Sequence, residues 1–192
     1  MNNAYFNELL QAIENTVVYY GDNCKKSLYV DGLAYLLNIF RRYKKSNAQV
    51  FFIGNGGSAA IASHMTADFM KNGGMCACSL YDSAVMTCIG NDYGYEYIFA
   101  KQLDQLGDAG DLLVAISSSG NSSNIVRTIQ VAKEKKIFVI TLTGFGVDNK
   151  ARCLGDVNVH VPCEEYGKIE SIHQLVLQQI VDMILAEDGV GL

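Results

Sequence analysis

Two glycine- and serine-rich stretches, each following a short apolar run, hold the residues of this chain best suited to chemistry. Residues 54–58 read GNGGS, and residues 117–124 read SSSGNSSN. Small residues let the backbone approach a ligand closely, while hydroxyl groups and the free N–H groups at a helix start favour an anion. Neither stretch has the lysine of a Walker loop or the GxGxxG spacing of dinucleotide sites. The two stretches therefore predict an uncharged phosphate site rather than a nucleotide site.

An imidazole and a carboxylate follow the first stretch. His64 and Asp68 are four residues apart in a segment with helical character, so they share one face of that helix. Such a pair could move protons on one small molecule. A single helical histidine is more often a structural residue, but the position of this pair directly behind the glycine stretch favours acid–base chemistry.

Five short apolar runs alternate with helical segments and must position these residues. The strands are expected at residues 50–53, 75–80, 111–116, 137–142 and 156–161, and later helices at 97–106, 125–135 and 165–185. This alternation predicts an α/β fold with a five-stranded parallel sheet covered by helices on both faces. Ligands bind such sheets beyond the carboxyl ends of the strands. Serine and asparagine could instead serve only as helix caps, but the recurrence of the pattern after a second strand favours phosphate binding.

Two further helices are expected before the first strand. Helix-period apolar residues run over 4–20 and roughly 24–45, with a turn at 21–23. Their apolar faces need a cover, which is either the sheet of the same chain or a partner subunit. We expect one domain over 1–192, formed by a helical extension at 1–46 and an αβα core at 47–187.

Composition excludes several classes of function. The net charge of −5 provides no basic field for nucleic acid, so no direct nucleic-acid partner is expected. The sequence shows neither a signal peptide nor about 18 consecutive apolar residues, so we expect a cytoplasmic protein without a membrane partner. The six cysteines lack metal-site spacing and are expected to be small core residues in a reducing compartment.

Several motifs together resemble those of a known family. They are GNGGSAA, an SH pair four residues before an acid, GND-x-G, ISSSGNSSN and VITLTG. The chain resembles SIS (sugar isomerase) domains, and within that group the phosphoheptose isomerases, over nearly its whole length. The resemblance implies a homotetramer with active sites between subunits. It also implies isomerisation of sedoheptulose 7-phosphate to glycero-manno-heptose 7-phosphate through an enediol.

The resemblance also implies roles for individual residues. The residues matched to phosphate binding are Ser58, Ser117, Ser118, Ser119 and Ser122. Those expected to contact the sugar are Asn55, Gly56, Gly57, Asp92 and Gln178. His64 and Asp68 match a histidine and an acid that face the reacting carbons and that help to hold zinc in some members.

Three positions depart from the family pattern. Asp68 stands where the family usually has the longer Glu, and Glu170 and Gln178 stand where its final helix has Gln and His. Gln cannot shuttle a proton, so the proton transfers are expected to be redistributed. Asp68 is the first candidate base, and the other catalytic candidates are Glu170, His64 and His173.

These departures leave other possibilities open. The candidate metal ligands His64, Asp68, Glu170 and Gln178 offer one nitrogen and three oxygens, whereas zinc usually prefers more nitrogen or sulfur. Zinc is accordingly a candidate cofactor only. The alternative functions are a non-catalytic SIS protein that binds a phosphosugar or acts as an adaptor, and an isomerase for a different phosphosugar.

Overall fold

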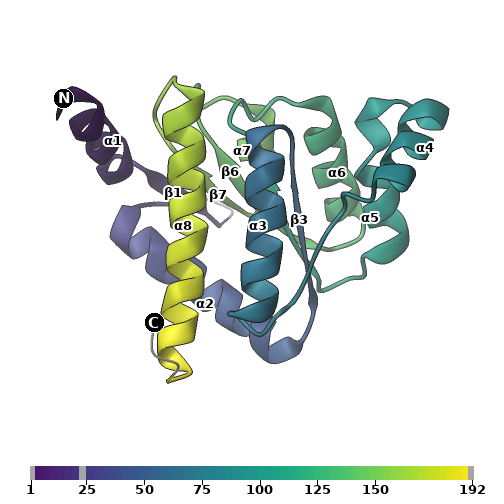
Figure 1. Cartoon of the computed structure of the whole chain (residues 1–192), viewed down its shortest axis with the longest axis horizontal. Helices are drawn as coiled ribbons and strands as arrows, with labels where there is room; N and C mark the ends of the chain where they lie inside the picture. The colour runs from purple at the N-terminus through teal and green to yellow at the C-terminus, as the bar shows by residue number, and fades with distance from the viewer. Residues whose placement is uncertain (1–2, 22–24, 190–192) are drawn as a thin grey trace.

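A single mostly parallel sheet forms the centre of the molecule. The computed structural model describes residues 3–21 and 25–189, and in this part of the chain the sheet has seven strands in the order β2-β1-β7-β6-β5-β3-β4 (Figure 1). The strands are β1 (Val17–Tyr20), β2 (Lys25–Leu28), β3 (Gln49–Gly54), β4 (Cys76–Ser79), β5 (Leu112–Ile116), β6 (Phe138–Thr143) and β7 (Val157–His160). The five strands from β3 to β7 are parallel, as the sequence predicts.

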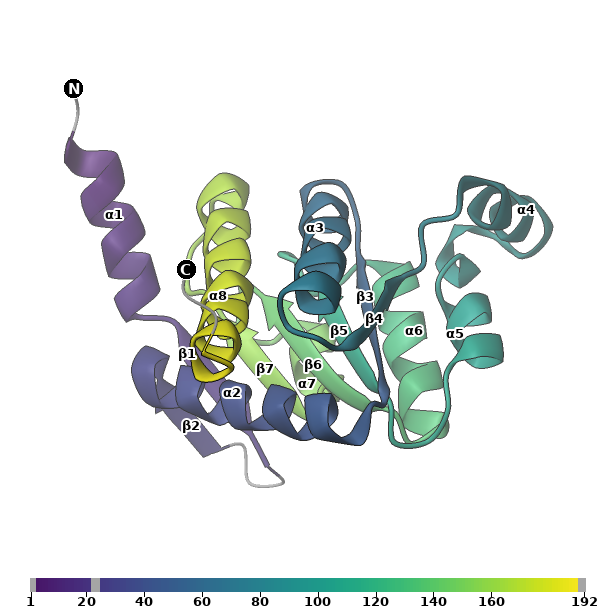
Figure 2. The ribbon, with the colours of Figure 1, turned by 60° about the horizontal axis from the view of Figure 1, so that its bottom comes forward.

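Helices cover both faces of the sheet (Figures 1 and 2). One face packs against α2 (Tyr29–Ser46), α3 (Gly57–Lys71) and α8 (Tyr166–Glu187). The other packs against α5 (Ala100–Leu106), α6 (Ser123–Glu134) and α7 (Lys150–Leu154). Each central strand is buried on both faces, so β5 is apolar at every position, and its alternate side chains enter the two cores.

Two helices lie at the ends of the molecule. The first, α1 (Asn3–Glu14), extends beyond α8, and Ala12 is its one buried residue (Figure 2). At the opposite end, α4 (Ser83–Tyr93) buries no residue, and the 3₁₀ turn η1 (Tyr95–Tyr97) leads from it toward α5. Both end helices therefore lie largely outside the hydrophobic core of this chain.

The N-terminal segment differs from the two long helices expected there. Helix α1 ends at Glu14, and residues 17–28 contribute an antiparallel pair of strands that extends the sheet from β7. The segment Val17–Tyr20 is rich in β-branched and aromatic residues, which favour a strand when an open sheet edge is available. The prediction of a five-stranded sheet and a purely helical extension was therefore wrong. Of the expected turn at 21–23, Gly21 has the left-handed φ of 72°, and the other two residues lie outside the described chain.

The expectation that the cysteines are small core residues holds only in part. Three of the described cysteines, Cys76, Cys88 and Cys153, are exposed rather than core residues, whereas Cys78 and Cys163 are partly buried and pack against the hydrophobic core. Cys24 lies outside the described residues.

The strand order brings the two glycine- and serine-rich stretches together. Residues 54–58, the first bend, follow β3, and residues 117–124, the serine bend, follow β5. From β3 the chain first forms the neighbour on one side, β4, and later returns to form the neighbour on the other side, β5. The helices that follow β3 and β5 diverge, because α3 packs on one face of the sheet and α6 on the other. Such a reversal of strand order opens a crevice beyond the carboxyl ends of the two strands.

An aromatic cluster fixes α3 between α2 and the sheet. The ring of Phe69 lies 4.8 Å from that of Phe40 on α2 and 5.2 Å from that of Phe52 on β3, centroid to centroid. All three side chains are fully buried. Phe69 therefore joins the helix that follows the first bend to two other elements.

Truncation of Phe69 should destabilise the protein strongly. Because Phe69→Ala leaves a cavity among three elements, we expect a loss of about 3–5 kcal/mol in the free energy of unfolding, measured by urea denaturation. The adjacent Met70→Ala is the control, since Met70 is exposed and its loss should change stability by less than about 0.5 kcal/mol. Equal effects of the two substitutions would contradict this packing.

Candidate functional site

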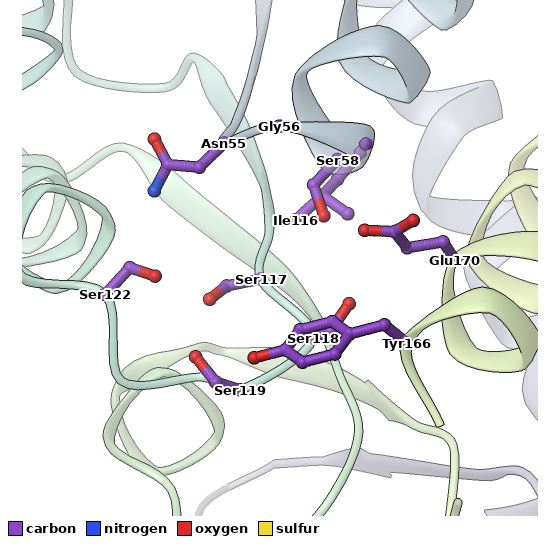
Figure 3. Close-up of a pocket in the computed structure, with 11 residues that line it drawn as sticks. Asn55, Gly56, Ser58, Ile116, Ser117, Ser118, Ser119, Ser122, Tyr166 and Glu170 are labelled. Carbon is purple, nitrogen blue, oxygen red and sulfur yellow. The ribbon is translucent and has the colours of Figure 1, made fainter. Parts of the chain in front are cut away.

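The two bends line a cavity of about 290 Å³ at the switch point of the sheet. Two residues of α8, Tyr166 and Glu170, complete its wall (Figure 3). The other lining residues are Asn55, Gly56, Gly57, Ser58, Ile116, Ser117, Ser118, Ser119 and Ser122. The structure thus brings together all five serines predicted to bind phosphate and the first three residues predicted to contact the sugar.

The cavity is rich in neutral hydrogen-bond donors. Ser122 is the N-cap of α6 and Gly56 is the N-cap of α3, and neither helix start is satisfied by a side-chain cap. The hydroxyl of Ser118 is buried without a hydrogen-bond partner in the described structure. No Lys, Arg or His is among the lining residues. Serine hydroxyls and two helix N-termini can bind an oxyanion without a fixed positive charge.

Close backbone approach requires glycine in the first bend. Gly56 has φ 55°, a conformation that side chains disfavour. A Cβ atom at Gly57 would lie 2.3 Å from Oε2 of Glu170, so the carboxylate packs directly against the first turn of α3. The bend and the acidic side chain of α8 are therefore fitted to each other.

A reciprocal amide pair joins the two bends. The side-chain amide of Asn55 donates to Oδ1 of Asn124 at 2.9 Å, and that of Asn124 donates to Oδ1 of Asn55 at 2.8 Å. The hydroxyl of Tyr95 also donates to Oδ1 of Asn55, at 3.0 Å. Asn124 is almost fully buried, so this contact is well protected from water. Much of the hydrogen-bonding capacity of Asn55 is therefore used to hold the bends together.

Each bend is also anchored to a neighbouring segment. The hydroxyl of Tyr81 accepts from the N–H of Gly54 and donates to its carbonyl, at 2.6 and 2.8 Å. Burial raises the pKa of Tyr81, so the phenol stays protonated and can serve as donor. The N–H of Ser117 donates to Leu142, and the carbonyl of Ser118 accepts from the N–H of Gly144. The serine bend is thus fixed to the end of β6.

His173 lies in the core behind the serine bend and does not line the cavity. It is fully buried, and its Nε2 is 3.2 Å from the carbonyl oxygen of Thr143, so Nε2 carries the proton and donates. Burial lowers the pKa of His173 to about 4, against the opposing effect of the Thr143 hydrogen bond. The predicted catalytic role of His173 is corrected accordingly: a buried neutral imidazole supports the end of β6 rather than contacting a ligand.

His64 and Asp68 share a helix face, as predicted, but that face lies outside the cavity. Nε2 of His64 is 3.5 Å from Oδ2 of Asp68, and 58% of the His64 side chain is exposed. Neither residue lines the cavity in this chain. The helical spacing fixes their mutual position, but it leaves open which surface the face meets.

Two predicted sugar contacts are also placed elsewhere. Asp92 is exposed on α4, where it accepts hydrogen bonds from Cys88 and Asn91. The amide of Gln178, two turns after Glu170 on α8, donates to Asp182 at 3.0 Å. Neither residue lines the cavity, because α4 lies at the end of the molecule and Gln178 lies farther along α8.

The four candidate metal ligands do not assemble into a zinc site within the chain. Residues 3–21 and 25–189 contain no group of three or more His, Cys, Asp or Glu side chains placed to hold a metal ion. His64 pairs with Asp68, Glu170 faces the cavity, and the Gln178 amide is directed at Asp182. These residues do not fit the nitrogen- or sulfur-rich set that zinc prefers.

The sequence interpretation missed three residues of the site. Asn124 ends the serine stretch, and its position there was the available signal for a role in that bend. Tyr95 belongs to an aromatic stretch for which packing was the favoured interpretation, and Tyr166 gave no signal, because their contacts come from elements remote in sequence.

Comparison with known proteins agrees with the motifs. The sequence profile described as "SIS domain" matches residues 31–144. The phosphoheptose isomerase of Helicobacter hepaticus is 36% identical over 151 residues, covering 76% of each chain. That of Aneurinibacillus thermoaerophilus is 38% identical over 151 residues, covering 76% of this chain and 75% of the relative. The solved phosphoheptose isomerase GmhA of Neisseria gonorrhoeae matches with a TM-score of 0.81 at 32% identity, over 94% of this chain and 95% of that one.

The buried His173 predicts a pH-dependent stability. Its pKa is lowered from 6.5 to about 4 in the folded state, so between these values the unfolded chain binds a proton that the native chain does not. The free energy of unfolding should therefore fall as the pH decreases through this range. In His173→Gln this fall should be smaller by about 3 kcal/mol, measured by urea denaturation at pH values across this range.

The exposed His64 provides the control for this measurement. His64→Gln replaces an imidazole that is 58% exposed rather than buried in the core, so it controls for the His-to-Gln substitution itself. A His173→Gln curve parallel to the wild-type curve would show that the imidazole of His173 is not buried as described.

Proposed function

Since this chain belongs to the SIS domain family, and within it to the phosphoheptose isomerases, we propose that it converts sedoheptulose 7-phosphate to glycero-manno-heptose 7-phosphate. The observation that carries the proposal is the cavity where five serines and two helix starts converge. That cavity has hydrogen-bond donors for a phosphate group, and its other wall, formed by the first bend, is available to contact a sugar.

The serine bend is proposed to hold the phosphate. Ser117, Ser118, Ser119 and Ser122 surround the start of α6, and Ser58 faces them from α3. Hydrogen bonds to a charged phosphate are worth about 1.5–3 kcal/mol each. Asn55, Gly56 and Gly57 are proposed to contact the sugar, because they line the same cavity on the side of the first bend.

The reaction moves a proton between adjacent carbons through an enediol. It needs a base on carbon, a group that relays the hydroxyl proton, and a donor that stabilises the developing oxyanion. Because Asp68 and His64 lie outside the cavity of their own chain, they would reach a ligand only where two copies meet. We therefore retain them as proposed residues of an intersubunit surface.

A homotetramer is proposed as the assembly. Helix α1 exposes Tyr5, Phe6 and Leu10, and it is held to α8 through Lys168, which contacts Glu8 and Glu165 at 2.5 Å. These hydrogen bonds raise the pKa of Lys168 and keep it charged. An apolar helix face with so little cover in its own chain is suited to contact with another copy.

The protein is also proposed to act in the cytoplasm. The described cysteines Cys76, Cys78, Cys88, Cys153 and Cys163 are all free, which suits a reducing compartment. Among the described residues, no helix has both the length and the apolar character needed to cross a membrane.

Replacement of one serine should weaken activity without unfolding the protein. Ser118→Ala removes a buried hydroxyl that has no other partner, so stability should change little while kcat/KM falls about 10–100-fold. The assay follows aldose formation from sedoheptulose 7-phosphate by NMR, with and without chelator and added zinc. Ser171→Ala is the control, because Ser171 is exposed on α8 and does not line the cavity.

The outcome for the wild-type protein decides the proposal. Phosphosugar binding without turnover would instead identify a non-catalytic SIS protein. Turnover of another sugar phosphate in preference to the heptose would identify an isomerase of different specificity.

The assembly proposal has its own measurement. Sedimentation equilibrium should give a mass of four chains, and Phe6→Asp on the exposed face of α1 should shift the population toward smaller species. A wild-type protein that sediments as a monomer at all concentrations would overturn the tetramer.

A further inference from the structure

The cavity contains one ionisable carboxylate, and it comes from α8. Of the lining residues, Glu170 is the one with an acidic side chain, and none is basic. Its carboxylate lies against Gly57 at the start of α3, where the helix dipole stabilises a negative charge. Glu170 is therefore placed to face a bound ligand.

Charge repulsion decides which part of a phosphosugar meets Glu170. A phosphate dianion and a carboxylate repel each other in a cavity that lacks a cation, so they are best held at opposite ends. Ser119 and Ser122 lie across the cavity from Glu170, whose carboxylate points toward Ser58 (Figure 3). With the phosphate at the serine bend, Glu170 meets the sugar.

Tyr166 lies beside Glu170 on the same helix face. The two residues are four apart on α8, and both line the cavity. The ring of Tyr166 packs edge-on against Phe145, with centroids 4.8 Å apart, and its hydroxyl points toward Ser119 (Figure 3). This hydroxyl can donate a hydrogen bond to a ligand in the cavity.

From this arrangement we propose that Glu170 transfers the proton between the two carbons and that Tyr166 stabilises and relays protons on their oxygens. The inference rests on the proposed isomerase function and assigns its chemistry to α8. It replaces Asp68 as the carbon base, because Asp68 does not line the cavity and Glu170 does.

The proton transfers balance without another reactant. Glu170 removes the proton from C1 of the open-chain ketose, and the C–H electron pair forms the C1–C2 double bond. Tyr166 gives its proton to the C2 oxygen as the carbonyl π bond breaks, which produces the enediol. The phenolate then accepts the proton of the C1 hydroxyl as the aldehyde forms, and Glu170 returns its proton to C2.

The test compares isosteric substitutions in the full-length protein. Glu170→Gln keeps the shape of the side chain but cannot accept a proton, so kcat should fall about 10²–10⁴-fold with little change in KM. Tyr166→Phe should lower kcat about 10²-fold through the loss of an oxyanion donor. Glu164→Gln is the control and should retain wild-type turnover, since Glu164 is exposed near the start of α8 and does not line the cavity.

A second readout separates chemistry from binding. In heavy water the wild-type enzyme should incorporate deuterium at C1 of the ketose and C2 of the aldose, whereas Glu170→Gln should not. Binding of inorganic phosphate, measured by calorimetry, should be retained or tightened in Glu170→Gln because a repulsive charge is removed.

Each result either supports or overturns the assignment. An active wild type with a Glu170→Gln variant within about threefold of its kcat would overturn it while leaving the isomerase function intact. Loss of phosphate binding together with turnover in Glu170→Gln would also overturn it, because that pattern identifies a structural residue. A wild type that fails to turn over any sugar phosphate would overturn the proposed function itself, and this assignment with it.

Discussion

The pairing of β3 with β5, with their following helices on opposite faces of the sheet, is the constraint on which the site depends. Because these strands are neighbours but belong to diverging βα units, the bends after them separate and enclose a cavity. The reciprocal amide pair of Asn55 and Asn124 then fixes the distance between the bends. Without this strand order, neither bend would face the other.

The cavity offers hydrogen-bond donors to an anion without a basic side chain. Its donors are hydroxyl groups and backbone N–H groups at two helix starts. Such groups bind an anion through oriented hydrogen bonds and dipoles rather than through a net positive charge. Among the lining residues no basic side chain balances the single carboxylate, Glu170. The buried histidine behind the serine bend is neutral and adds no charge to this field.

Helix α8 connects the site with the rest of the molecule. It supplies Tyr166 and Glu170 to the cavity, supports β6 through His173, and joins α1 through Lys168. Its first turns are thus tied to both the ligand cavity and the exposed N-terminal helix.

Local sequence determined the parallel core and the two glycine- and serine-rich bends of this protein, because apolar runs, glycine and serine encode strand, turn and hydrogen-bond chemistry over a few residues. It also determined that His64 and Asp68 share a face, since helical spacing fixes that relation. Only the tertiary structure decided which surface the face meets, that Tyr166 and Glu170 complete the cavity, and that Val17–Tyr20 forms a strand. These features depend on packing and on an available sheet edge, which arise from residues far apart in the chain.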